Sequence, residues 1–391
     1  DGISSSSRFI KGGGYMLKVP AIDIAEVGAG GGSIASLDPG GLLVVGPESA
    51  GAEPGPACYG LGNDRPTVTD ANVVLGYFNP AGLVGGALPI DRARAVRAVE
   101  EHIARPLGLG VAEAAHGIRR VANVTMARAL RAVTVERGLD PRGMALTAFG
   151  GSGPAHAVDL ARLLGVRRVV VPALSGVFCS VGMLASDVEH STVRPLLGRL
   201  DALEPVRFDA ARTALREEGM ATLRREGFSG DAAELRVFAE MRYVGQSSEL
   251  AVEVPDRPFA DGLAGALAEG FHRVYAATYG YENDEPVELV ALRLSALGRQ
   301  SSRLDFAAMR MREAPPPTGG GTRAVSFARG EGPVETPVIA RAEIGADWRD
   351  GPAIVEAYDT TVVVPPVARL RADGCGSLVI EPRYPAAWDA T

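Results

Sequence analysis

Two glycine clusters are the residues of this chain whose type and spacing could do chemistry. One is the segment FGGSGP at 149–154, and the other is GAGGGSIA at 28–35. Backbone without Cβ atoms lets a ligand approach closely, and the free N–H groups at a helix start favour anions. The spacing matches neither GxGxxG nor GxxxxGK[ST], which are the common nucleotide-binding patterns. Nucleotide binding is one interpretation of the clusters, and tight turns without a ligand are the other.

The later cluster lies inside a segment that predicts a strand, a turn, a helix and a second strand. Met144–Phe149 is mostly apolar and short enough for one buried strand. Pro154 favours the first turn of a helix that runs to Leu164, and Gly165 provides a left-handed stop. Val166–Val171 then predicts the second strand. This order of elements builds parallel sheets, so the sequence predicts an α/β protein.

The earlier cluster also follows a predicted strand, at 19–27. Ser33–Leu37 could begin a helix, although the Asp-Pro-Gly-Gly sequence at 38–41 limits it to about one turn. The glycine- and proline-rich segment at 46–63 predicts a long loop, and loops of this length are often functional.

Three carboxylates and one histidine are candidate functional groups. Asp70 and Asp187 could act in catalysis and Asp23 could bind Mg²⁺, because residues near strand ends in parallel-sheet enzymes hold metals or water. Each of the three is also a plausible helix cap. His156 lies in the predicted first helical turn after GGSGP. It could contact a ligand phosphate or base there, or hydrogen-bond a loop carbonyl.

Other reactive side chains lack an arrangement that would activate them. The five histidines show no HxxxH or HExxH spacing, and no CxxC occurs. Ser33 and Ser152 are flanked by glycine but lack the GxSxG elbow of a hydrolase nucleophile. Cys58 could be a nucleophile, but a buried structural thiol fits its loop better. The pair Arg119-Arg120 is expected to be ordinary solvated charge.

The overall composition excludes several classes of partner. The formal net charge of the 391 residues is −7 and no basic tract occurs, which argues against nucleic acid. No apolar run approaches the ~18 residues of a membrane span, so no membrane partner is expected. Three widely spaced cysteines and no visible secretory signal favour a reducing, cytoplasmic location.

Changes of composition along the chain predict three regions. We expect a nucleotide-binding domain at 1–200, and an α/β region with a strand pair and helices at 201–313. The segment APPPTGGG at 314–321 predicts a linker, and short β-type runs beyond it predict a small β-rich domain at 322–391. No internal repeat of fixed period is present.

Long motifs across nearly the whole chain resemble the hydantoinase A/5-oxoprolinase family. They include VPAIDIAEVGAGGGSIA, SAGAEPGPACYG, PTVTDANVVLG, MARALRAVTVERGLDPRGMALTAFGGSGPAHA, RYVGQSSELAVEVP and GPAIVEAYDTTVVVPP. The resemblance implies an actin-like ATPase fold, in which ATP lies between two ribonuclease-H-like domains. Family members also carry DxGGT phosphate hairpins, which this sequence lacks. The chain thus resembles the C-terminal portion of a longer member, without the N-terminal half of the ATPase core, so it is expected to be inactive alone.

The same resemblance implies roles for both glycine clusters. Gly150, Gly151, Ser152 and Gly153 would approach the adenosine side of ATP, and Gly30, Gly31, Gly32 and Ser33 would line the same cleft. With Mg²⁺, ATP would phosphorylate the carbonyl oxygen of a cyclic amide of the hydantoin or 5-oxoproline type. Hydrolysis would follow on a hydantoinase B-type subunit or domain, in a hetero-oligomer. The alternatives are a subunit of an ATP-dependent ketone carboxylase, or a scaffold that does not catalyse.

Overall fold

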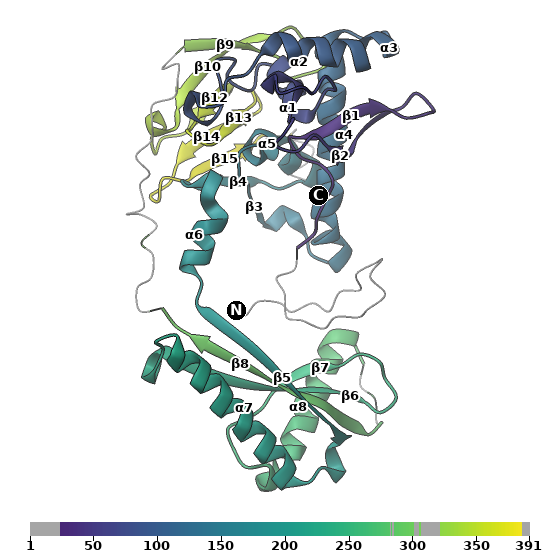
Figure 1. Ribbon diagram of the computed structural model, residues 1–391, viewed down its shortest axis with the longest axis vertical. Helices are drawn as coiled ribbons and strands as arrows, with labels where there is room; N and C mark the ends of the chain where they lie inside the picture. Colours follow the sequence, from purple (N-terminus) through teal and green to yellow (C-terminus); the bar gives the residue numbers. More distant parts are fainter. Residues whose placement is uncertain (1–23, 282, 284, 301–304, 306–320, 385–391) are drawn as a thin grey trace. The chain divides into compact units, whose positions relative to one another are not determined.

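The chain forms two compact units, each described here by itself. The computed structural model describes residues 24–281, 283, 285–300, 305 and 321–384 (Figure 1). The larger unit comprises 23–182 together with 305–391, and the smaller unit comprises 1–22 together with 183–304.

The larger unit contains a hairpin and two sheets. The hairpin pairs β1 with β2, one sheet has the order β13-β12-β10-β9, and the other has the order β11-β14-β15-β4-β3. The strands are β1 (Ser33–Leu37), β2 (Leu43–Ser49), β3 (Ala145–Thr147), β4 (Arg168–Val171), β9 (Gly321–Val325), β10 (Val334–Ala340), β11 (Arg349–Asp350), β12 (Ala353–Glu356), β13 (Thr361–Val364), β14 (Ala368–Ala372) and β15 (Leu378–Pro382).

The larger unit also contains helices. They are α1 (Val68–Val74), α2 (Arg92–Val99), α3 (Arg105–Leu107), α4 (Val111–Ala132), α5 (Gly153–Leu164) and α6 (Phe178–Ala185), the last of which crosses the boundary between the units. The predicted strand–turn–helix–strand unit is confirmed as β3, α5 and β4, but the prediction that its first strand is buried was wrong, because β3 lies at the sheet edge with Ala145 and Thr147 exposed. Strands β3 and β4 pair in parallel, with Leu146 opposite Val169. Pro154 occupies the first turn of α5, and Gly165 ends the helix in the left-handed conformation with φ of 74°.

The segment Ser33–Leu37 is a strand, so the prediction of a helix start there was wrong. It pairs antiparallel with β2, and the Asp38–Gly41 turn closes the hairpin. The Asp38 carboxylate accepts the N–H groups of Gly40 and Leu42, each at 2.9 Å. Pairing with β2 satisfies the backbone hydrogen-bonding groups of this segment. The prediction failed because the local sequence does not show that a partner strand lies beside it.

The C-terminal strands complete the larger unit, which corrects the expected separate β-rich domain at 322–391. Strand β15 lies beside β4, with Ile380 opposite Val169 (Figure 1). One apolar core joins Val325 of β9 to α1 and α4, and a second joins Ile380 to α5. Both cores mix residues from before 182 with residues from after 320, so neither segment buries its apolar side chains alone.

The smaller unit is a four-stranded antiparallel sheet of order β5-β8-β6-β7, with two helices packed on it. Its elements are β5 (Val188–Arg199), α7 (Pro205–Arg225), β6 (Ala233–Tyr243), β7 (Leu250–Glu253), α8 (Ala264–Tyr279) and β8 (Val287–Gly298). One apolar core contains Leu215 of α7, Phe271 of α8 and Leu294 of β8, so both helices cover the same face. Because β5 pairs with β8 along most of its length, the boundary falls near 183 rather than at the expected 200.

None of the helices in the described residues is long and apolar enough to span a membrane.

The shared cores of the larger unit lead to a stability prediction. Ile380 of β15 is fully buried in the core that β15 shares with α5. Ile380→Ala should therefore lower the free energy of unfolding by about 2–5 kcal/mol. Hydrogen exchange should show that amides of β3 and β4 lose protection together with those of β15. Phe271→Ala is the control, because it leaves the same kind of cavity in the smaller unit. Loss of protection confined to 321–384 would contradict the shared core.

Candidate functional site

The structure brings the two glycine clusters into direct contact in the larger unit. A Cβ atom placed on Gly31 would lie 3.0 Å from Ser152 Oγ and 2.8 Å from Thr69 Oγ1. The Thr69 N–H donates to the Gly31 carbonyl at 2.8 Å, which fixes the first cluster against the start of α1. A side chain at position 31 would require the hydroxyl groups of Thr69 and Ser152 to move, so glycine suits this close approach.

A cavity of about 200 Å³ lies beside this contact. Its lining includes Thr69, Gly151 and Ser152, together with Tyr358 and Asp359 of the β12–β13 connection. A lining that combines glycine backbone, hydroxyl groups and an aromatic ring suits a ligand with both a polar and a planar part.

The loop at 150–153 is held by its carbonyl groups and leaves amide groups available. Gly150 has a φ of 80°, which favours glycine, and its N–H donates to the Ser175 carbonyl at 2.8 Å. Thr360 Oγ1 donates to the carbonyl oxygens of Gly150 and Gly151, at 3.0 and 3.2 Å. Within the described residues, no acceptor meets the N–H groups of 151–153. These amides, at the positive end of the α5 dipole, can receive an anion.

Thr360 and Asp359 are site residues that sequence reasoning missed. Asp359 Oδ2 accepts the Gly176 N–H at 2.8 Å, which holds the β12–β13 connection against the loop after β4. Both residues belong to the motif AYDTTVVVPP, which carried part of the family resemblance but received no role. Their position in the motif was the signal that could have identified them.

In the glycine cluster at 28–35, some polar groups hydrogen-bond to one another. Ser33 is buried, and its Oγ accepts the Gly30 N–H at 2.9 Å. Ser33 therefore stabilises the turn of its own cluster, a role the resemblance had not given it. The structure places Gly30, Gly31 and Gly32 in the turn that leads into β1.

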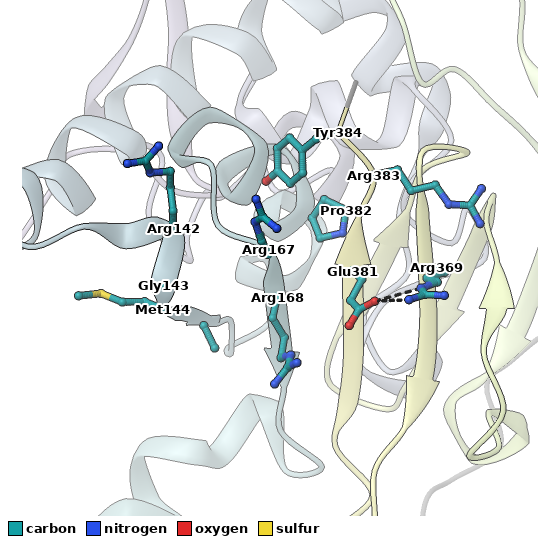
Figure 2. Close-up of a pocket in the computed structure, with 11 residues that line it drawn as sticks. Arg142, Gly143, Met144, Arg167, Arg168, Arg369, Glu381, Pro382, Arg383 and Tyr384 are labelled. Carbon is teal, nitrogen blue, oxygen red and sulfur yellow. Dashed lines mark hydrogen bonds and ion pairs between the residues drawn. The ribbon is translucent and has the colours of Figure 1, made fainter. Parts of the chain in front are cut away.

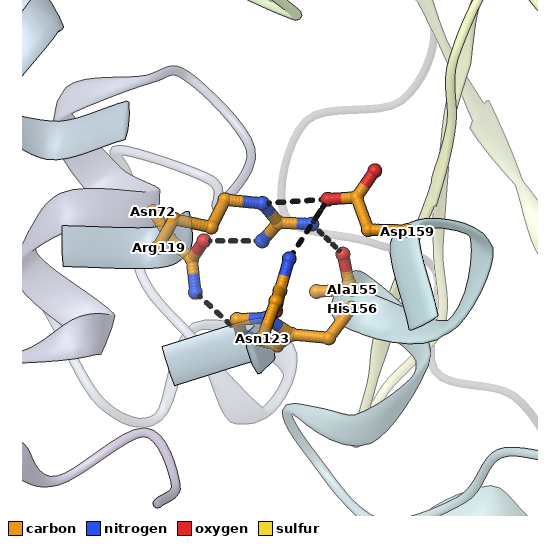
Figure 3. A network of polar contacts seen from close by, with 6 residues as sticks. All are labelled: Asn72, Arg119, Asn123, Ala155, His156 and Asp159. Atoms are coloured by element: carbon orange, nitrogen blue, oxygen red, sulfur yellow. Dashed lines mark hydrogen bonds and ion pairs between the residues drawn. The ribbon is translucent and has the colours of Figure 1, made fainter. Parts of the chain in front are cut away.

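His156 belongs to a buried polar network rather than to the cavity wall, so its assignment as a ligand contact is corrected. It is 1% exposed, its Nδ1 lies 2.6 Å from Asn123 Oδ1, and its Nε2 lies 3.3 Å from Asn72 Nδ2 (Figure 3). These partners fit a neutral ring that donates from Nδ1 and accepts at Nε2. Burial, and secondly the Arg119 charge, hold the pKa of His156 well below its ordinary value.

Arg119 is the centre of this network, although it had been expected to be solvated. Its guanidinium donates to Asn72 Oδ1 at 2.7 Å, to Asp159 Oδ2 at 2.9 Å and to the Ala155 carbonyl (Figure 3). It also lies over the Tyr77 ring, 4.6 Å from the centroid. The network joins α1, α4 and α5. It therefore sets the distance between Thr69 on α1 and the amides at the start of α5.

Comparison with known proteins shows which family the chain belongs to. The model for hydantoinase/oxoprolinase matches residues 4–192. The chain belongs to the hydantoinase/oxoprolinase family. It is 39% identical to the caprolactamase subunit alpha of Pseudomonas jessenii, over 97% of this chain and 55% of that protein. The acetophenone carboxylase gamma subunit of Aromatoleum aromaticum is 34% identical, over 95% of this chain and 52% of that protein.

A solved structure supports the same relationship. The crystal structure of the ATP-dependent caprolactamase from Pseudomonas jessenii matches with a TM-score of 0.75 and 38% identity, over 95% of this chain and 54% of that chain. The fold is thus a mixed α/β fold of the hydantoinase/oxoprolinase type. The chain spans about half the length of the curated relatives it matches.

In this family member, Asp70 is a structural carboxylate, which corrects its assignment to catalysis. It is fully buried, and its Oδ2 accepts the N–H groups of Thr67 and Ala57 at 2.8 and 3.1 Å and the Thr67 hydroxyl at 2.8 Å. Its Oδ1 accepts the Cys58 N–H at 2.8 Å. Burial raises the pKa of the Cys58 thiol, and the Asp70 charge raises it further, which favours a structural thiol over a nucleophile.

Asp187 and Asp23 stay predictions as functional groups. Asp187 is exposed in the smaller unit, where its Oδ1 accepts the Gln300 N–H at 3.0 Å. Asp23 lies outside the described residues. Over the part of the chain that the structure describes, no three His, Cys, Asp or Glu side chains gather to hold a metal ion.

Because Asp70 is buried and Asp187 is exposed, replacing each by alanine tests how much burial of the carboxylate matters for stability. Asp70→Ala leaves buried N–H donors without acceptors, so it should lower the free energy of unfolding by about 3 kcal/mol. Asp187→Ala removes one exposed acceptor and should change it by less than about 0.5 kcal/mol. Chemical denaturation measures both. Equal stability of the two variants would show that Asp70 is not the anchor of the 57–67 loop.

His156 predicts a pH dependence of stability. Its folded pKa is depressed, so below its ordinary value of 6.5 the unfolded chain binds more protons than the folded chain. Stability is therefore full above pH 6.5 and falls as the pH falls toward the folded pKa, by up to about 1.4 kcal/mol per pH unit. His156→Gln should flatten this slope, measured by denaturation between pH 5 and 7. His116→Gln is the comparison variant. Burial also lowers the pKa of His116, but less than that of His156, so His116→Gln should flatten the slope less. Equal slopes in wild type and His156→Gln would contradict the prediction.

Proposed function

We propose that the chain forms part of the ATP site of an enzyme that hydrolyses a cyclic amide. The observation that carries this proposal is the contact of the two glycine clusters, at Gly31 and Ser152, beside a cavity. The similarity to the caprolactamase subunit alpha supports the choice of reaction. An actin-like arrangement, with ATP held between this chain and a second ribonuclease-H-like domain, is consistent with a chain that spans half the length of its relatives.

The residues fit the phosphates of ATP better than they fit a metal. Although the resemblance puts 150–153 on the adenosine side of ATP, the N–H groups of 151–153 at the start of α5 have no protein acceptor in the described residues, which favours phosphate oxygens as their partners. No cluster of carboxylates for Mg²⁺ occurs among the described residues. Asp23, which lies outside the described residues, stays the predicted Mg²⁺ ligand.

The chemistry that ATP supplies is activation of the amide carbonyl. Transfer of the γ-phosphoryl group to the carbonyl oxygen releases ADP and makes the carbonyl carbon a better electrophile for water. Residues of this chain hold the nucleotide in place: the amides at 151–153 bind the phosphates, and Thr360 fixes the loop that presents them. Attack of water on the phosphorylated carbonyl carbon would then break the ring C–N bond and release inorganic phosphate, on a hydantoinase B-type partner in a cytoplasmic hetero-oligomer.

A ketone carboxylase subunit is the second candidate. The 34% identity to the acetophenone carboxylase gamma subunit favours it, and the same glycine clusters would serve it. The two functions differ in what drives ADP formation in the complete complex. The proposed hydrolase needs only the cyclic amide, whereas a carboxylase needs both a ketone and bicarbonate. ADP formation that requires bicarbonate would contradict the hydrolase assignment.

Gly151→Val tests the nucleotide site directly. A Cβ atom there would lie 3.5 Å from the Asp359 carbonyl, so the fold should tolerate it, while the valine methyl groups would fill the cavity. Calorimetry with Mg-ATP on the full-length protein should show binding at least about tenfold weaker than in the wild type. Gly345→Val is the control, since position 345 is exposed and has open space around its Cβ. Unchanged ATP affinity in Gly151→Val would refute the assignment.

A further inference from the structure

A second cavity of the larger unit lies beside α4 and α5. It measures about 560 Å³, within the ~300–1,000 Å³ that is typical of small-molecule sites. Arg120 and Val124 line it from α4, and their spacing of four residues places them on one face of that helix. Asp159, Arg162 and Leu163 line it from α5, at spacings of three and four that again give one helix face. Two packed helices therefore form much of the lining.

Two cations of this lining have no anionic partner. The Arg119 guanidinium is paired within the buried network, and Arg329 pairs with Glu113. Arg120 and Arg162 are exposed, and neither makes an ion pair or a hydrogen bond within the described residues. Exposed guanidinium groups on two neighbouring helices can bind a carboxylate through charge-assisted hydrogen bonds.

The Asp159 carboxylate has one oxygen that its own network does not use. Its Oδ2 accepts from Arg119 at 2.9 Å and from Asn123 Nδ2 at 3.1 Å. Its Oδ1 accepts no hydrogen bond in the described part of the chain, and Figure 3 shows this oxygen pointing away from the network. The side chain is 39% exposed and lines the cavity, so Oδ1 can accept from a ligand donor.

Apolar side chains lie among these charged groups. Val124 and Leu163 are both exposed, and the half-buried Phe327 adds an aromatic ring from the connection between β9 and β10. A ligand with an apolar body would remove this surface from water, which is favourable by about 25 cal/mol per Å². The lining thus offers cations, one anionic acceptor and an apolar surface within one cavity.

This cavity is separate from the glycine site. The two cavities share no lining residue. Helix α5 begins at Gly153, and Arg162 lies nine residues later, which is about 14 Å along the helix. One ligand group therefore cannot contact both Arg162 and the amides at the start of α5.

We propose that the cavity beside α4 and α5 binds a small amino acid whose carboxylate and amino group are separated by an apolar chain. The carboxylate pairs with Arg120 and Arg162, the ammonium donates to Asp159 Oδ1, and the chain covers Leu163. Each kind of group in the lining then has a partner. A phosphate would use the arginines but would leave the Asp159 oxygen and the apolar surface without one.

Opening of a cyclic amide yields a molecule of this class. Hydrolysis of the ring C–N bond leaves a carboxylate and an amine on one chain. Identifying the ligand as the reaction product rests on the proposed function, whereas binding of an amino acid rests only on the groups in the cavity.

The test is calorimetric titration of the full-length protein with 6-aminohexanoate at low salt. The wild type should bind one molecule, and Arg162→Gln should weaken binding about tenfold because one charge-assisted contact is lost. The double variant Arg120→Gln/Arg162→Gln should weaken it further. Arg97→Gln is the control for the change of charge, since Arg97 is an exposed arginine of α2 outside the cavity, and it should bind as the wild type does.

Matched ligands test Asp159 without a substitution in the buried network. Hexanoate lacks the amino group and should bind about fivefold to tenfold more weakly than 6-aminohexanoate, because Asp159 Oδ1 then has no donor. Hexylamine lacks the carboxylate and should bind more weakly still. Hexanoate or hexylamine binding as tightly as 6-aminohexanoate would refute the amino acid assignment.

Two further results would overturn the proposal. They are no binding of 6-aminohexanoate at millimolar concentration, and equal binding by the wild type and the double variant. Gly151→Val separates this proposal from the proposed function. Binding of 6-aminohexanoate that survives in Gly151→Val supports a second site, and its loss there would place the ligand at the glycine clusters and refute the proposal. Absence of ATP binding in the wild type would refute the nucleotide site alone.

Discussion

The buried guanidinium of Arg119 is the interaction on which the arrangement of the site depends. A charge removed from water is costly unless it is paired and hydrogen-bonded, and here Asp159, Asn72 and the Ala155 carbonyl provide the partners. Because these partners lie on α1 and α5 while Arg119 lies on α4, the network fixes three helices at once. The glycine clusters meet because α1 contacts the first and α5 begins at the second.

Asp70, in the first turn of α1, also holds separate segments together. Its carboxylate satisfies three backbone N–H groups and one hydroxyl, so the 57–67 loop is tied to the start of α1. A buried polar group with complete partners is a source of rigidity, and removal of one partner leaves the others unsatisfied. His156, predicted as a ligand contact, and Asp70, predicted as a catalytic group, thus both support the candidate site from behind.

The β3–α5–β4 unit presents different chemistry at its two ends. After β3, glycine backbone and helix N–H groups are available to a ligand, whereas the ends where β3 and β4 begin carry arginine side chains. The C-terminal segment contributes to both ends, with Thr360 at the glycine loop and Arg369 at a cavity of about 760 Å³ beside the starts of β3 and β4 (Figure 2). Insertion of residues 321–384 into the sheets of the larger unit is therefore what completes each cavity.

The sequence by itself determined the local elements: the β3–α5–β4 unit, the proline start and glycine stop of α5, and most helices and strands. These follow from periodicity and from turn residues, which act over a few positions. Only the tertiary structure decided that 33–37 is a strand, that β15 joins β4, and that Asp70, His156 and Arg119 are buried. Each of those outcomes depends on partners far away in the sequence, such as Asn123 for His156. Hydrogen bonding and burial are decided by these partners and not by neighbours along the chain.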